Sequence, residues 1–95
     1  MDRITTTIKR EWLSEIVDGT KNVEYREIKQ YWEDRLAKVS IPFELRLING
    51  MQKKAPEVIV LIKKIRRDTK NNRFELHIEK IVNYKYWNAT KKRPK

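Results

Sequence analysis

The run Val58-Ile59-Val60-Leu61-Ile62 is the longest apolar stretch of this 95-residue chain. Its residues are β-branched or leucine, and an unbroken apolar run of this length is typical of a strand that is buried on both faces. The run is far too short to cross a bilayer. It therefore predicts the central strand of a folded domain, around which the other elements are arranged.

Strands of alternating polarity are predicted on both sides of this run. Phe43–Leu47 alternates apolar and polar residues, and so does Phe74–Ile78, which continues towards Tyr84. Asn49-Gly50 predicts a hairpin turn after the first of these strands. The polar segment Asp68–Asn72 predicts the turn that precedes the second one.

The N-terminal half adds two strands and two helices. Thr5–Ile8 is β-branched and favours a strand, and helical spacing then predicts a helix over Lys9–Asp18 that ends at Gly19. A strand over Asn22–Ile28 and a helix over Lys29–Lys38 follow. Short strands in this order predict an α+β domain, built as a small closed or partly closed antiparallel barrel with two flanking helices.

Aromatic residues in these elements are expected mainly in the core. Helical spacing predicts that Trp12 and Trp32 are buried. Tyr25 alternates with Glu24 along its strand and is expected to pack inward. Tyr31 is then the better candidate for the wall of a cleft.

Length and composition limit the domain organisation. Residues 1–87 form one predicted domain, and the basic residues 88–95 are expected to be a flexible tail. The absence of cysteine excludes a disulfide scaffold and a thiolate zinc site, and one histidine, His77, makes no metal centre. The N-terminus lacks the apolar stretch of a signal peptide, so a cytoplasmic protein without membrane segment, metal or cofactor is expected.

The net charge of +10 favours a polyanionic partner. It arises from 23 lysines and arginines against 13 acidic residues, and nucleic acid is the commonest partner of such a surface. Lys63, Lys64, Arg66 and Arg67 concentrate charge at one predicted hairpin, where they could follow a phosphate backbone. The alternative is a solvated face that serves solubility only.

Lys21, Glu24 and Arg26 are the candidate site residues. Lys21 follows a glycine turn, where it could act as a base if desolvated, bind a phosphate if exposed, or simply be solvated. Glu24 and Arg26 share one face of a strand. They could hold a phosphate or a base edge between them, or form a structural ion pair.

Three motifs in the first third of the chain resemble a known family. They are Lys9-x-x-Trp12-Leu13-x-x-Ile16, Gly19-x-Lys21-x-x-Glu24-Tyr25-Arg26 and Tyr31-Trp32. Together they resemble the ASCH domain, a relative of the PUA RNA-binding fold, and the likeness extends over Ile4–Tyr84. The resemblance implies a PUA-like barrel with a cleft beside the helix that precedes Gly19. It also implies RNA binding or RNA-linked chemistry.

The resemblance also carries a possible activity. A few small ASCH members remove the acetyl group from 4-acetylcytidine, using a motif lysine that corresponds to Lys21 and a threonine where this chain has Glu24. That difference favours binding over hydrolysis. The leading hypothesis is therefore binding of RNA or a nucleotide by Lys21, Arg26, Tyr31 and the basic hairpin. The alternatives are an amidohydrolase or ribonuclease with Lys21 and Glu24 as catalytic residues, and a domain that docks an acidic protein.

Overall fold

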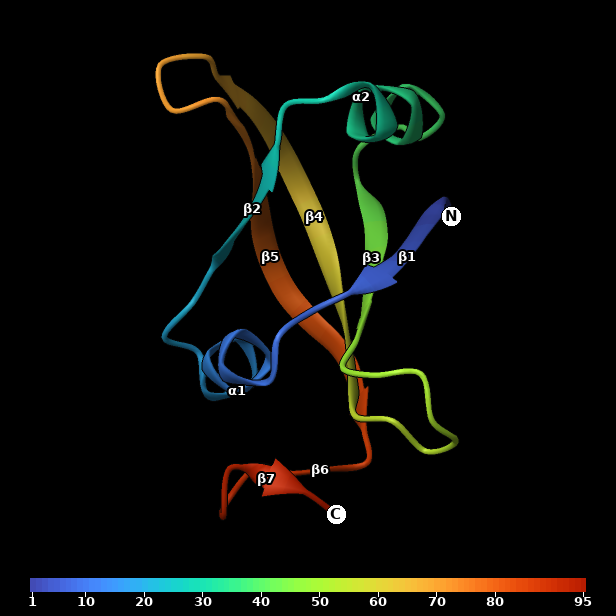
Figure 1. Cartoon of the computed structure of the whole chain (residues 1–95), viewed down its shortest axis with the longest axis vertical. Coiled ribbons are helices and arrows are strands. Elements are labelled where there is room, and N and C mark those ends of the chain that lie inside the picture. The colour runs from blue at the N-terminus through green and yellow to red at the C-terminus, as the bar shows by residue number, and fades with distance from the viewer.

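The computed structural model describes residues 1–95. Figure 1 shows a curled sheet with one helix at its upper end and the other in the lower half, above the C-terminal segment. In chain order the elements are β1 (Arg3–Thr7), α1 (Arg10–Asp18), β2 (Val23–Glu27), α2 (Gln30–Ala37), β3 (Phe43–Ile48), β4 (Glu57–Asp68), β5 (Arg73–Lys85), β6 (Trp87–Asn88) and β7 (Arg93–Pro94). The predicted α+β class, with two helices and this order of the first seven elements, is confirmed.

The main sheet is a half-barrel with two free edges. Its strand order is β1-β3-β4-β5-β2, so β1 and β2 are the edge strands. Neighbouring strands are antiparallel except β1 and β3, which are parallel. The prediction of a wholly antiparallel sheet is wrong for that pair. A parallel pair needs a long crossover, and α1, β2 and α2 together provide one.

Arginine side chains bridge the open seam between the two edge strands. Arg26 of β2 donates through Nη2 to the carbonyl of Thr7 at 2.8 Å. Arg35 of α2 donates to the carbonyl of Thr5 at 2.6 Å. Thr5 and Thr7 are alternate residues of β1, so their carbonyls point away from β3 towards the seam. Two guanidinium groups thus take the place of a missing neighbouring strand.

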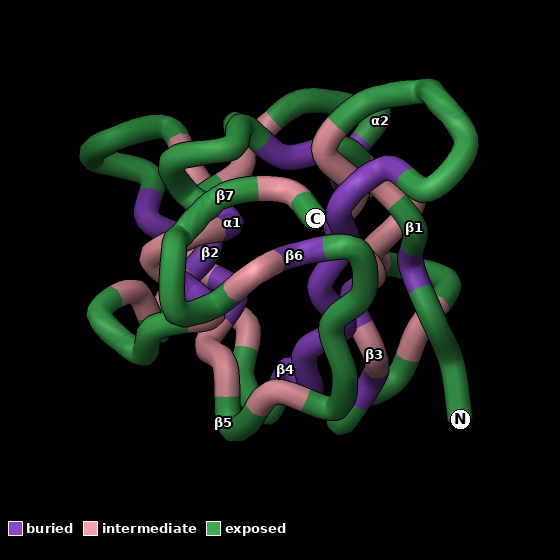
Figure 2. Tube along the Cα trace, turned by 90° about the horizontal axis from the view of Figure 1, so that it is seen from below, coloured by how far each residue is buried: buried purple, intermediate pink, exposed green.

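The core lies inside the curl of the sheet. The run Val58–Ile62 is buried along its whole length, as predicted. Leu13 and Ile16 of α1 and Trp32 of α2 pack against the inner face of the sheet. Trp87 of β6 is 1% exposed and belongs to this core, and Figure 2 shows a buried stretch in β6 between exposed segments.

Two aromatic residues lie outside the core, contrary to prediction. Trp12 is 40% exposed, because α1 is short and presents Leu13 and Ile16 to the sheet, which turns Trp12 about 100° away. Tyr25 is 43% exposed. The alternation along β2 is as predicted, but Glu24 faces inward and Tyr25 outward. The burial of Trp32 is confirmed.

The connection after β3 and the end of the chain differ from simple expectations. Asn49-Gly50 does not form a tight hairpin, because residues 49–56 make a longer loop before β4 begins.

Residues 88–95 fold back as the ribbon β6–β7, and Lys95 donates its backbone N–H to the carbonyl of Tyr86 at 3.2 Å. The flexibility expected of these residues stays a prediction. No helix is long and apolar enough to span a membrane.

Trp87 is expected to be indispensable for stability, although it lies near the end of the chain. Trp87→Ala should lower the free energy of unfolding by about 3–5 kcal/mol, because it empties a fully buried site. Trp12→Ala is the matched control, since the same side chain is removed from a half-exposed position. Urea unfolding followed by circular dichroism measures both. Equal losses for the two variants would contradict this role.

Candidate functional site

The carboxylate of Glu24 is the centre of the predicted motif. Glu24 is 5% exposed and lies beside Leu76 on the inner face of the sheet. Its Oε2 is 2.5 Å from Nη2 of Arg26, and its Oε1 is 3.4 Å from Nζ of Lys21. A buried carboxylate needs such partners, because an unpaired charge in the interior is costly. The three motif residues therefore form one ion-paired cluster.

Lys21 is held firmly and is mostly covered. The preceding Gly19 ends α1 with φ 88°, and the backbone N–H of Lys21 then donates to the carbonyl of Glu15 at 3.0 Å. At the other end, Nζ donates to the carbonyl of Val23 at 2.7 Å. The ammonium also lies 5.4 Å from the ring centre of Trp12 and 5.0 Å from that of Tyr25, within the range of cation–π attraction.

A groove runs beside this cluster, between α1 and β2. It has a volume of about 460 Å³ and is called the Trp12 groove below. Its lining consists of Thr7, Ile8, Lys9, Trp12, Tyr25, Arg26 and Asn49. A second hollow of about 280 Å³ contains Lys21 and shares the rings of Trp12 and Tyr25 with the groove. The exposed aromatic residues thus form the wall between two adjoining hollows.

Sequence reasoning missed part of this lining. Trp12 was assigned to the core, and Asn49 to a turn. The spacing Lys9-x-x-Trp12 places both side chains on one face of the first turn of α1, and this was the available signal. Asn49 is engaged within the protein, because Nδ2 donates to the carbonyl of Ile8 at 2.9 Å.

The turn of the predicted basic hairpin lies away from α1. In Figure 1 the β4–β5 turn is at the upper end of the molecule, as α2 is, whereas α1 is in the lower half. Arg67 forms a two-point ion pair with Glu33 of α2, at 2.6 and 3.0 Å, and this pair lowers the pKa of Glu33. Tyr31 is 51% exposed on α2, against Arg35, and it does not line the groove.

Side chains on the outer face of the same hairpin also form ion pairs and hydrogen bonds with one another. Arg66 contacts Glu75 at 2.7 Å, and His77 bonds the other carboxylate oxygen at 3.1 Å. The bond from His77, and then the charge of Arg66, lower the pKa of Glu75. Lys63 and Lys64 are exposed and have no ion-pair partner. The structure thus brings Lys21, Glu24 and Arg26 together and leaves Tyr31 outside the groove. The base of the hairpin runs alongside β2, because Arg67 and Arg26 are both ladder partners of Phe74, and the guanidinium of Arg73 lies 4.0 Å from the ring centre of Tyr25.

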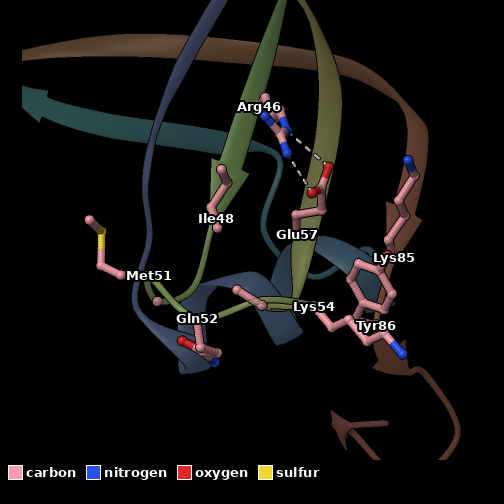
Figure 3. Close-up of a pocket in the computed structure, with 10 residues that line it drawn as sticks. Arg46, Ile48, Met51, Gln52, Lys54, Glu57, Lys85 and Tyr86 are labelled. Carbon is pink, nitrogen blue, oxygen red and sulfur yellow. Dashed lines mark hydrogen bonds and ion pairs between the residues drawn. The ribbon is translucent and has the colours of Figure 1, made fainter.

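A further pocket lies below β3 and β4, and no sequence pattern indicated it. It has a volume of about 440 Å³ and is called the Arg46 pocket below. Figure 3 shows Arg46 and Glu57 joined by two bonds on its upper wall, with Lys54, Lys85 and Tyr86 around its mouth. The bonds measure 3.0 and 2.8 Å, and they lower the pKa of Glu57.

Comparisons with protein-family models, curated proteins and solved structures found no match. The structure contains no group of three or more histidine, cysteine, aspartate or glutamate side chains that could hold a metal ion. A function for this protein is therefore inferred from the arrangement of its groove residues.

Replacing Glu24 should cost stability, because its two cations would stay buried without their carboxylate. Glu24→Gln is expected to lower the free energy of unfolding by about 1–3 kcal/mol. Glu27→Gln on the same strand is the matched control, since Glu27 is exposed and has no ion pair. Urea unfolding followed by tryptophan fluorescence compares them. A Glu24→Gln midpoint as high as that of the control would disprove the structural role of this cluster.

The Arg46–Glu57 pair should make stability depend on acid pH. The pKa of Glu57 in the folded protein lies below its ordinary value of 4.5, so the pair stabilises the fold above that pH. This stabilisation is lost as the pH falls through the folded pKa.

Arg46→Met should return the pKa of Glu57 towards 4.5 and flatten the acid dependence of unfolding. An NMR titration of the Glu57 carboxyl carbon measures the pKa directly. Arg93→Met, an exposed arginine without an ion pair, serves as the control. An unchanged Glu57 titration in Arg46→Met would show that the pair does not govern this pKa.

Proposed function

We propose that this protein binds single-stranded RNA, or a nucleotide, in the Trp12 groove. The observation that carries the proposal is the pair of half-exposed rings, Trp12 and Tyr25, beside the cations Lys9 and Arg26. Flat side chains next to basic ones suit the stacking of unpaired bases and the neutralisation of their phosphates. The volume of about 460 Å³ lies in the range of small-ligand sites.

Arg26 is oriented in advance for such a role. Its Nη2 bonds both Glu24 and the carbonyl of Thr7, and these two contacts fix the plane of the guanidinium. Arg26 also lines the groove. The hydrogens on its Nη1 atom have no acceptor within the protein. A phosphate or a base edge can accept them without any rearrangement of the side chain.

The resemblance to ASCH domains agrees with this proposal. The curled sheet and the groove beside α1 support it, although the sheet is an open half-barrel with one parallel pair and not a closed antiparallel barrel, and the net charge of +10 favours a polyanionic ligand. Membership is part of the proposal and rests on the motif residues from Lys9 to Trp32.

Removal of the aromatic wall should weaken binding without a change of charge. Trp12→Ala is expected to lower the affinity for short single-stranded RNA about tenfold or more, because base stacking contributes about 1–3 kcal/mol per base. Tyr31→Ala is the matched control, an exposed aromatic residue outside the groove. Fluorescence anisotropy at fixed salt measures both. Equal affinities of the two variants would refute RNA binding in the groove. If the protein binds an acidic protein more tightly than RNA, and added RNA does not displace that partner, docking of an acidic protein is favoured instead.

Hydrolysis of a modified nucleoside is a second candidate function. The observation in its favour is the closeness of Lys21 and Glu24, at 3.4 Å, beside the smaller hollow. Lys21 could activate a water for attack on an amide carbon, and Glu24 could take the proton of that water and pass it to the departing amine. With 4-acetylcytidine the products would be acetate and cytidine.

This second candidate is tested by incubating the pure protein with 4-acetylcytidine and measuring release of acetate. Turnover that disappears in Lys21→Ala, with the fold intact by circular dichroism, would support hydrolysis. Tyr31→Ala should retain it. No turnover by the wild-type protein across a broad pH range would remove this candidate and leave binding.

A further inference from the structure

The Trp12 groove and the Arg46 pocket adjoin each other at the start of the β3–β4 loop. Ile48 and Gly50 line the pocket, whereas Asn49 between them lines the groove. The two hollows therefore lie on either side of Asn49. Ile48 is also the ladder partner of Thr7, which lines the groove from β1.

Asn49 forms a fixed ridge between them. Its backbone N–H donates to the carbonyl of Pro56 at 2.8 Å, and its amide Nδ2 donates to the carbonyl of Ile8 at 2.9 Å. Arg10 donates to the amide oxygen at 3.4 Å. A ligand that leaves the groove over this ridge therefore meets a rigid surface, which costs little ordering on binding.

The Arg46 pocket retains positive charge. Arg46 and Glu57 satisfy each other through their two-point ion pair. Lys54 and Lys85 also line the pocket, and both are exposed without a carboxylate partner. Their ammonium groups suit an anion such as a phosphate, and the charge of Lys85 also helps to lower the pKa of Glu57.

The same pocket holds unusual backbone conformations. Lys54 and Tyr86 both have φ 58°, in the left-handed region that residues with bulky side chains rarely adopt. Such strained conformations are often found at ligand-binding positions. The ring of Tyr86 is 39% exposed and lies between the side chains of Lys85 and Lys54, as Figure 3 shows.

We propose that the Arg46 pocket is a second nucleotide subsite. The ligand is then a single-stranded RNA segment of at least two nucleotides that crosses the Asn49 ridge. One base stacks in the Trp12 groove, and the next phosphate lies between Lys54 and Lys85 with its base against Tyr86. This inference rests on the proposed binding in the groove, and it selects an RNA segment over a free mononucleotide as the ligand.

The experiment compares ligand lengths. Adenosine, cytidine and uridine 5′-monophosphates and the corresponding ribotetranucleotides are titrated into ¹⁵N-labelled protein, followed by NMR. The tetranucleotides should bind at least tenfold tighter than the monophosphates and shift the amides of both hollows. The monophosphates should shift the groove only.

The double variant Lys54→Ala/Lys85→Ala should lose most of this gain with length and leave monophosphate affinity unchanged. The slope of log affinity against log salt should also fall by about 0.7 for the tetranucleotides, because the two lysines share one phosphate and about 0.7 counterions are released per phosphate neutralised on a single strand. Lys29→Ala/Lys70→Ala removes the same charge from exposed positions near α2 and should keep both values. Tyr86→Gly, which accepts the positive φ, removes the ring alone and should also weaken only the tetranucleotides.

The outcomes separate the two proposals. If monophosphates and tetranucleotides bind equally in the groove, or if the two double variants behave alike, the second subsite is refuted and groove binding stands. If neither ligand binds, the proposed function and the second subsite both fail. Length-dependent binding that only the Lys54/Lys85 variant loses supports the subsite.

Discussion

The buried carboxylate of Glu24 is the interaction on which the rest of the site depends. It draws Arg26 and Lys21 to one point, and each cation then binds a carbonyl or an aromatic ring beyond it. Arg26 in turn connects β2 with the opposite edge strand β1. One acidic group therefore links the local geometry of the motif to the closure of the half-barrel. Loss of this carboxylate would leave two largely buried cations unpaired, which is costly in the interior of a protein.

Periodicity allowed most of the fold to be predicted. The unbroken run Val58–Ile62 identified the central strand, and helical spacing placed α1 and α2 within about a residue of their observed bounds. What periodicity cannot determine is which of two alternating faces is buried. On β2 the inward position belongs to Glu24, because partners within the fold satisfy its charge, and Tyr25 takes the outer face.

The candidate site was predicted in part for the same reason. The motif residues Lys21, Glu24 and Arg26 are close in the chain and remain together in the structure. The groove needs long-range neighbours as well, and the meeting of Asn49 with Ile8 depends on the parallel pairing of β1 and β3. For the basic hairpin, the sequence overestimates the free positive charge. Its arginines are neutralised by Glu33 and Glu75, which a count of charges along the sequence does not reveal.

The arginine bridges across the seam have a consequence for the behaviour of the molecule at high concentration. A free sheet edge is a template on which a strand of another molecule can add, and such addition leads to aggregation. The carbonyls of Thr5 and Thr7 on the free edge of β1 are already occupied by Arg26 and Arg35. The two guanidinium groups also place positive charge along that edge, which repels the same edge of a second copy. These bridges therefore leave two fewer carbonyls on the edge of β1 for pairing with a strand of another molecule.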